Sequence, residues 1–162
     1  MRAAPAAALL VLALVGCGGD GPLELVSAER PAGAEAAGKN SERQGDPDPD
    51  AGEPIFKLRP TEGDALSYKV TVRNTSSDTI EVTGVKADKE RDGAFVPERV
   101  DGAPVKIEAG ASAPVTIEGR VEGCRFGGQR VSLAGPELEL DDDGTQQFDL
   151  GLQVELLVEG CS

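Results

Sequence analysis

The chain has 162 residues, which is enough for one compact domain, since single domains most often run to about 100–150 residues. Its 29 acidic and 16 basic residues give a net charge of -13, which repels nucleic-acid phosphates and therefore excludes nucleic-acid binding as the main function. The chain has no histidine, so it lacks the commonest general base and the commonest metal ligand. Aromatic residues make up only 3% of it, so we expect an aliphatic core.

The first residues have the pattern of a secretory signal peptide. Met1 and Arg2 are followed by an apolar run over residues 3–15 and by the small residue Gly16. The run is too short to cross about 30 Å of hydrocarbon as a helix, which takes roughly 20 residues. We therefore predict that residues 1–16 are a signal peptide that is cleaved from the mature protein.

The segment Leu14-Val15-Gly16-Cys17 resembles the lipobox of bacterial lipoproteins. The resemblance implies that Cys17 receives a lipid and becomes the first residue of the mature chain, with residues 17–22 as lipidated cysteine and flexible tether. An anchor of two or three acyl chains would hold the protein at the extracytoplasmic face of the cell membrane. The alternative is an ordinary secretory signal that ends beside a cysteine by chance.

The two other cysteines are predicted to form a disulfide. The chain has three cysteines, and lipidation of Cys17 leaves the even pair Cys124 and Cys161. Such a pair in an oxidising compartment is normally bonded, and the bond would fix the last strand close to the end of the chain. A functional thiol is the alternative; Arg125 beside Cys124 is the one feature that favours it.

Residues 23–162 are predicted to form the folded domain, which begins with two edge strands. Leu23, Leu25 and Val26 indicate the first. Between Glu29 and Glu53 the chain is polar and has no apolar periodicity, which predicts a disordered acidic loop at about residues 30–53. The second edge strand contains Ile55, Phe56 and Leu58, between Pro54 and Pro60.

Residues 65–74 alternate cleanly between apolar and polar side chains. Leu66, Tyr68, Val70 and Val72 share one face, and a period of two is typical of a half-buried strand. Turn-forming residues fill positions 74–78, after which Ile80 and Val82 resume the alternation. We interpret residues 65–82 as a β-hairpin.

The rest of the chain repeats this pattern in short segments. Alternating apolar residues occur at Val105 and Ile107, at Val115, Ile117 and Val121, at Val131 and Leu133, and at Leu138 and Leu140. A last, longest strand is expected over residues 148–158, with Phe148, Leu150, Leu152, Val154, Leu156 and Val158 all facing inward. Short strands separated by turns predict an all-β, immunoglobulin-like antiparallel sandwich of about seven or eight strands.

Two of these segments also resemble a known family. Residues 68–85 and 104–117 are similar to the Ig-like domains of bacterial surface proteins and lipoproteins, in which an asparagine closes the second strand. The chain lacks tryptophan and the pair of cysteines that joins the sheets of antibody domains, so the resemblance is to a generic Ig-like domain. It implies a fold and no activity.

Two acidic clusters raise the question of calcium. Asp46-Pro-Asp-Pro-Asp50 resembles the opening of an EF-hand loop, but the sixth position is Ala51 in place of glycine and the twelfth is Lys57 in place of glutamate. The second cluster is Asp141-Asp142-Asp143-Gly144. We interpret both as solvated loops and predict no metal site, with weak binding of calcium or envelope polysaccharide as the alternative.

No motif for catalysis is found. The chain has no Gly-x-Ser-x-Gly elbow and no phosphate-binding loop, and without histidine it has no catalytic triad. We therefore expect a non-enzymatic, membrane-anchored lipoprotein that needs no cofactor and acts by contact with another protein of the cell envelope.

Overall fold

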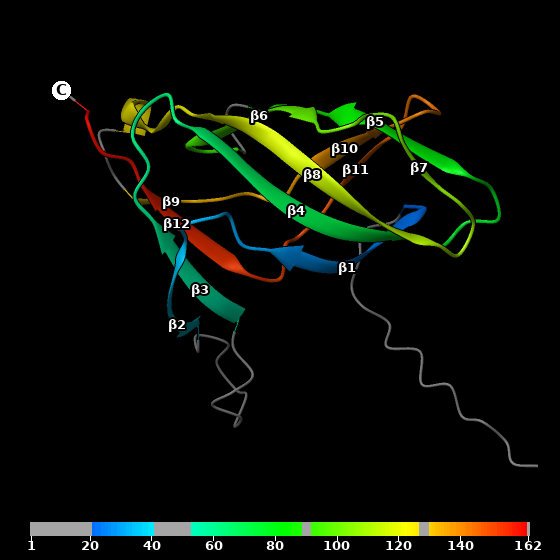
Figure 1. Cartoon of the computed structure of the whole chain (residues 1–162), viewed down its shortest axis with the longest axis horizontal. Coiled ribbons are helices and arrows are strands. Elements are labelled where there is room, and N and C mark those ends of the chain that lie inside the picture. The colour runs from blue at the N-terminus through cyan, green and yellow to red at the C-terminus, as the bar shows by residue number, and fades with distance from the viewer. Residues whose placement is uncertain (1–20, 41–52, 89–91, 127–129, 162) are drawn as a thin grey trace, which may run out of the picture.

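A computed structural model describes residues 21–40, 53–88, 92–126 and 130–161. Within these ranges twelve strands form three sheets of four strands each, and one short 3-10 helix follows the eighth strand (Figure 1). The elements are β1 (Leu23–Glu29), β2 (Glu35–Asn40), β3 (Glu53–Leu58), β4 (Ala65–Asn74), β5 (Ile80–Val85), β6 (Phe95–Val100), β7 (Val105–Ile107), β8 (Ser112–Val121), η1 (Gly123–Phe126), β9 (Arg130–Ser132), β10 (Glu137–Leu140), β11 (Thr145–Gln147) and β12 (Gln153–Leu157).

The three sheets share one hydrophobic core. The first sheet has the strand order β1-β4-β8-β6, the second β11-β10-β5-β7 and the third β2-β3-β12-β9. In Figure 1, β4 and β8 cross in front of β10 and β11, and the third sheet lies toward the end that carries the C-terminus. Buried side chains from all three sheets belong to a single cluster, which includes Val70, Val82 and Val154.

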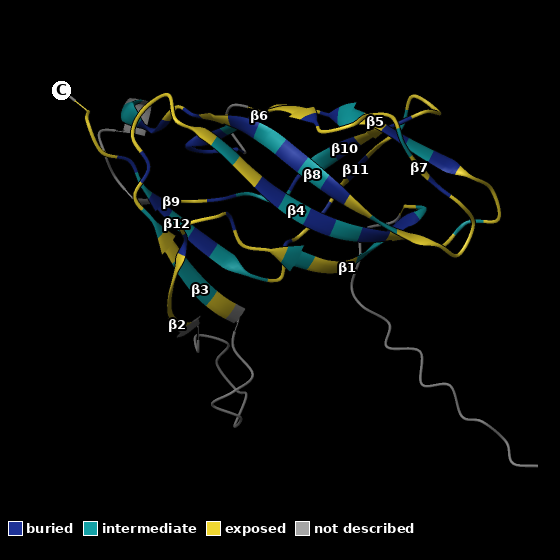
Figure 2. Cartoon of the chain, in the orientation of Figure 1, coloured by how far each residue is buried: buried dark blue, intermediate teal, exposed yellow. Residues whose placement is uncertain are grey.

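The long strands β4 and β8 form the middle of the first sheet. Buried and more exposed residues alternate along both strands in Figure 2, as the period of two predicts. The inward residues Val70 and Val72 of β4 and Val115, Ile117 and Val121 of β8 are aliphatic. The ring of Tyr68 on β4 meets the Phe95 ring of β6 edge to face at 5.7 Å. Gly119 of β8 makes room for β6, since a Cβ there would lie 2.2 Å from the carbonyl oxygen of Val96.

The all-β prediction is confirmed, but two details of it are wrong. The expected seven or eight strands are twelve in the described part of the chain, and β3 and β12 run parallel where a wholly antiparallel arrangement was expected. Strand β6 was missed because Pro97 and a bulge between Pro97 and Arg99 interrupt its alternation. Proline and bulges are tolerated there because β6 is an edge strand.

The segment expected to be a disordered loop contains a strand. Strand β2 pairs with β3 in an antiparallel register in which Ala36 faces Phe56. Residues 35–38 are all exposed, so no apolar pattern marks the strand in the sequence. The predicted strand around Phe56 is present, but it lies inside the third sheet and not at its edge; β1 is an edge strand, as expected.

The predicted hairpin over residues 65–82 is wrong. Strand β4 pairs with β1 and β8, whereas β5 pairs with β10 and β7, so the turn between them carries the chain from one sheet to another. The fully buried Asn74 side chain fixes this crossing, because its Nδ2 donates to the carbonyls of Asp78 at 2.7 Å and of Ile107 at 2.9 Å. Its Oδ1 accepts hydrogen bonds from the amide and the hydroxyl of Ser76.

The predicted last strand over residues 148–158 is shorter than expected, because only its second half, β12, is a strand. β11 ends at Gln147 in the second sheet and β12 begins at Gln153 in the third. Phe148 and Leu150 are buried between them, and Gly151 adopts a positive φ of 63°. The alternation of inward residues is confirmed except that Leu152 is only partly buried, and residues 148–152 connect the second sheet to the third.

Candidate functional site

The predicted disulfide is present and Cys17 cannot be placed. Cys17 lies outside the described residues, as does the acidic cluster at residues 46–50. Cys124 in η1 is bonded to Cys161 across 37 positions of sequence, with the Cα atoms 5.2 Å apart. The bond joins the end of the chain to the segment that follows β8, as the cysteine count predicted.

A carboxylate lies beside this disulfide. The Glu62 side chain accepts a hydrogen bond from the backbone amide of Cys124 at 2.9 Å. One carboxylate oxygen of Glu62 and the two sulfur atoms of Cys124 and Cys161 all lie within 4.8 Å of one another. Glu62 and Cys161 are exposed, so this group, which we call the Cys-Glu cluster, is open to solvent.

The C-terminal segment is held near the cluster by contacts other than the disulfide. The amide of Glu159 donates to the carbonyl of Pro60 at 2.8 Å, and the amide of Glu62 donates to the carbonyl of Glu159 at 3.3 Å. Arg59 forms an ion pair with the Glu159 side chain at 3.4 Å. The segment around Glu159 is thus paired with residues 59–62 in its own right.

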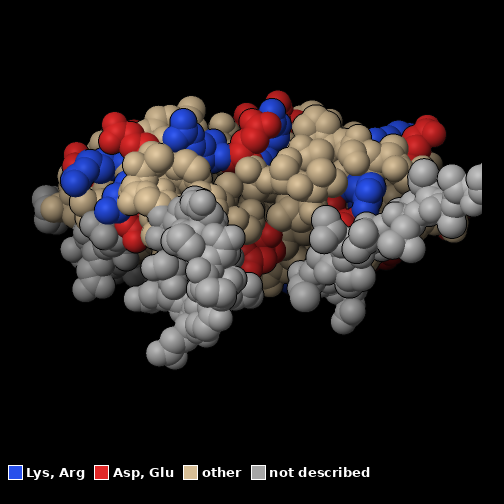
Figure 3. Space-filling model, turned by 90° about the horizontal axis from the view of Figure 1, so that it is seen from below, with Lys and Arg blue, Asp and Glu red and all other residues tan. Residues whose placement is uncertain are grey.

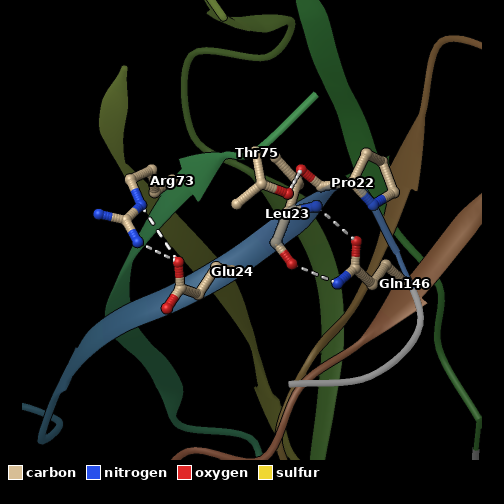
Figure 4. A network of polar contacts seen from close by, with 6 residues as sticks. All are labelled: Pro22, Leu23, Glu24, Arg73, Thr75 and Gln146. Atoms are coloured by element: carbon tan, nitrogen blue, oxygen red, sulfur yellow. Dashed lines mark hydrogen bonds and ion pairs between the residues drawn. The ribbon is translucent and has the colours of Figure 1, made fainter. Parts of the chain in front are cut away.

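A second group of polar contacts fixes the start of β1 (Figure 4). The Gln146 side chain of β11 is buried; its Oε1 accepts from the amide of Leu23 at 3.0 Å, and its Nε2 donates to the carbonyl of Leu23 at 2.5 Å. Leu23 also faces Asn74 in the pairing of β1 with β4. Gln146 therefore extends the hydrogen bonding of β1 to the second sheet, which joins the two sheets at this edge.

Residues on either side of Leu23 are held as well. The Thr75 amide and hydroxyl both donate to the carbonyl of Pro22, at 2.8 and 3.0 Å. Arg73 donates from Nε to Glu24 at 3.1 Å and forms an ion pair with it. Together with Gln146, these contacts hold the first described residues on the body of the fold, and we call them the N-terminal clamp.

A groove lies on the outer side of the first sheet. Its volume is about 480 Å³, and it is lined by residues of the segment before β4 and of β4, β6 and β8. Four charged side chains meet there in two pairs: Arg99 with Glu118 at 2.5 Å, and Arg120 with Glu98 at 2.7 Å. We call this feature the ion-pair groove.

The backbone explains this concentration of charge. Because of the bulge in β6, the consecutive residues Glu98 and Arg99 are both exposed. On β8, Glu118 and Arg120 lie two positions apart and therefore share the outer face. Other described parts of the surface also mix the two signs, as Figure 3 shows from below, but the ion-pair groove adds a concave shape to the mixture.

The acidic cluster at residues 141–144 forms the turn between β10 and β11. Its Asp142 carboxylate accepts from the amide of Gly144 at 3.0 Å, and the Leu140 amide donates to the Gly144 carbonyl at 2.9 Å. Asp143 has a positive φ of 61°, which aspartate adopts more readily than most residues. Hydrogen bonds within the turn account for its conformation, and weak calcium binding there stays an alternative to the predicted solvated loop.

Neither the N-terminal clamp nor the ion-pair groove was predicted from the sequence. The clamp had one signal: Gln146 is a polar residue at a position that continues the inward series of Phe148 and Leu150. The groove had none, because the bulge that places Glu98 beside Arg99 on one face breaks the pattern from which strands are predicted.

Comparisons with known proteins found no match to this chain, either among models of protein families or among curated proteins. Among the described residues, no helix has the length and apolar character required to cross a bilayer.

Proposed function

We propose that this protein is a lipoprotein anchored through Cys17 to the extracytoplasmic face of the cell membrane, and that its non-enzymatic domain binds another envelope protein. The N-terminal clamp is the observation that carries the proposal. Pro22, Leu23 and Glu24 are each held by a residue of the body of the fold. Five peptide steps from Cys17 to Pro22 reach at most about 18 Å, so a lipid on Cys17 would keep this end of the domain close to the membrane.

We further propose that the first and second sheets form an Ig-like sandwich. The crossing at Asn74 supports this, since it carries the chain from β4 in one sheet to β5 in the other. The buried residues of β4 and β5, such as Val72 and Val82, belong to the same core cluster. A sandwich of this kind presents its outer faces for contact with a partner.

The ion-pair groove is the contact surface that we propose. Exposed ion pairs of this kind contribute little to stability, typically about 0–1 kcal/mol, so their four charges are available to a partner at little cost. Their alternating signs favour a protein segment that carries both positive and negative side chains. Charge complementarity of this kind contributes more to the specificity and orientation of binding than to the affinity for the partner.

The anchor is tested by replacing Cys17 with Ser in the full-length chain. We expect the parent protein in the membrane fraction, with an intact mass that lacks residues 1–16 and includes lipid, and the variant either released or kept as its precursor. Unaltered membrane association of the Cys17→Ser variant, or a mature mass without lipid, would contradict the proposal.

The contact surface is tested by photo-cross-linking in intact cells. A photoreactive residue at Ser67, which is exposed in the groove, should capture one reproducible protein, whereas the same residue at the exposed Thr83 of β5 serves as the control. Exchanging the charges of one pair, by Glu98→Arg together with Arg120→Glu, keeps an ion pair but reverses its direction. We expect the exchange to abolish capture at Ser67; equal capture at both positions, or capture that the exchange leaves unchanged, would argue against the groove.

A further inference from the structure

The Cys-Glu cluster brings together three groups that bind soft divalent metals when they are ionised. Thiolate sulfur is the preferred protein ligand of such metals, and carboxylate oxygen often completes their coordination. In the bonded state the sulfur atoms of Cys124 and Cys161 are joined to each other and are poor ligands. We propose that reduction of this disulfide creates a binding site for a single soft divalent metal ion, such as Zn²⁺ or Cd²⁺, formed by Cys124, Cys161 and Glu62.

The position of Glu62 is the first argument. One of its carboxylate oxygens accepts the hydrogen bond from the Cys124 amide, which fixes the side chain against η1. The three ligand atoms already lie within 4.8 Å of one another. A tetrahedral metal with bonds of about 2.0–2.3 Å holds its ligand atoms roughly 3.3–3.8 Å apart. The two sulfur atoms must therefore move apart from bonding distance after reduction, while the Glu62 oxygen already lies within reach of both.

The hold on the C-terminal segment is the second argument. A disulfide that alone kept two segments together would release them on reduction. Here the backbone hydrogen bonds of Glu159 with Pro60 and Glu62, and the ion pair of Glu159 with Arg59, do not depend on the sulfur atoms. Cys161 lies two positions beyond Glu159, so its thiol stays near Cys124 after the bond is broken.

Reduction of the Cys124–Cys161 disulfide takes place by exchange with a dithiol. The dithiol gives two electrons and two protons to the disulfide, becomes a disulfide itself, and leaves Cys124 and Cys161 as thiols. Metal binding then displaces both protons, so that two thiolates and one carboxylate surround a doubly charged ion. Glu62 and Cys161 are exposed, which leaves the fourth coordination position open to water.

This inference does not depend on the lipid anchor, and its test uses the full-length chain with Cys17→Ser, in which the two cysteines of the cluster are the only ones. The protein is reduced with a dithiol, freed of the reductant without air, and titrated with Cd²⁺ while the thiolate-to-cadmium absorption in the ultraviolet is followed. We expect no such absorption from the oxidised protein and one Cd²⁺ bound per chain in the reduced protein. No stoichiometric absorption after reduction would overturn the proposal.

Variants test the ligands one by one. Cys161→Ser should abolish stoichiometric binding. Glu62→Gln should keep the absorption but weaken the affinity for Cd²⁺ by roughly tenfold or more, since even the loss of an outer partner of a metal site has that effect. Glu122→Gln alters an exposed carboxylate two positions before Cys124 that is not part of the cluster, and should change nothing. Equal affinities of the Glu62 and Glu122 variants would show that Glu62 is not a ligand and would refute the site as proposed.

Discussion

The disulfide should contribute a large share of the stability of this domain. Replacing Cys124 and Cys161 by Ser opens a loop of 37 positions. The loss of chain entropy on closing such a loop in the unfolded state corresponds to about 4 kcal/mol at 25 °C. Small domains unfold with a total of only about 5–15 kcal/mol, so the effect is easily measured. We expect the melting temperature to fall by about 8–16 °C.

The assay is equilibrium unfolding in urea, compared with thermal unfolding, for the Cys17→Ser chain with and without the two further replacements. The contacts of Glu159 with Pro60 and Glu62 stay in place in the variant, so the native state should be preserved and the loss should come from the unfolded state. A loss below about 1 kcal/mol would contradict this reasoning, because the constraint on the unfolded chain does not depend on those contacts.

Three further outcomes are expected from single replacements, each measured against the parent. Asn74→Ala removes the bonds to two backbone carbonyls at the sheet crossing and should cost about 2–4 kcal/mol in urea unfolding; a loss under 1 kcal/mol would contradict its role. Gly119→Ala places a Cβ 2.2 Å from the carbonyl oxygen of Val96 and should destabilise the domain by about 1–3 kcal/mol. An unchanged melting temperature would show that β6 can move away from the new Cβ without loss of stability. The hydrogen bond to Glu81 and the negative charge of Glu81 raise the pKa of Lys106. The Lys106–Glu81 pair therefore stabilises the fold fully at pH values below the ordinary pKa of lysine. This stabilisation is lost as the pH rises through the raised pKa of Lys106. Glu81→Gln should return the pKa of Lys106 toward its ordinary value in an NMR titration, and an unaltered pKa would refute this cause.

The sequence predicted what depends on local periodicity. The alternation in β4 identifies its buried face correctly, from Tyr68 to Val72, because a strand with one face in the core needs apolar residues at every second position. The disulfide was predictable from the count of cysteines. The strand around Phe56 was predicted from its apolar residues between Pro54 and Pro60.

What the sequence did not predict depends on pairing between distant segments. The turn after Asn74 has the composition of a hairpin turn. It is a crossing between sheets because β5 pairs with β10 and β7 and because Asn74 bonds to the carbonyl of Ile107. Strands β2 and β6 form because a neighbouring strand offers free hydrogen-bonding groups, so their own residues need no alternation. The ion-pair groove follows from the bulge in β6 and was therefore also hidden.

The N-terminal clamp has a mechanical consequence. Strand β1 begins at Leu23 beside Asn74 and runs antiparallel to β4. A force applied to the chain before Pro22, parallel to β1 and directed away from the body of the fold, would therefore load all of the β1–β4 hydrogen bonds together in shear. Bonds strained together resist rupture better than bonds opened one after another from the end of a strand. The two hydrogen bonds of Gln146 to Leu23 would take up part of the same force at its point of application. A pull in that direction is therefore opposed both by the β1–β4 hydrogen bonds and by Gln146.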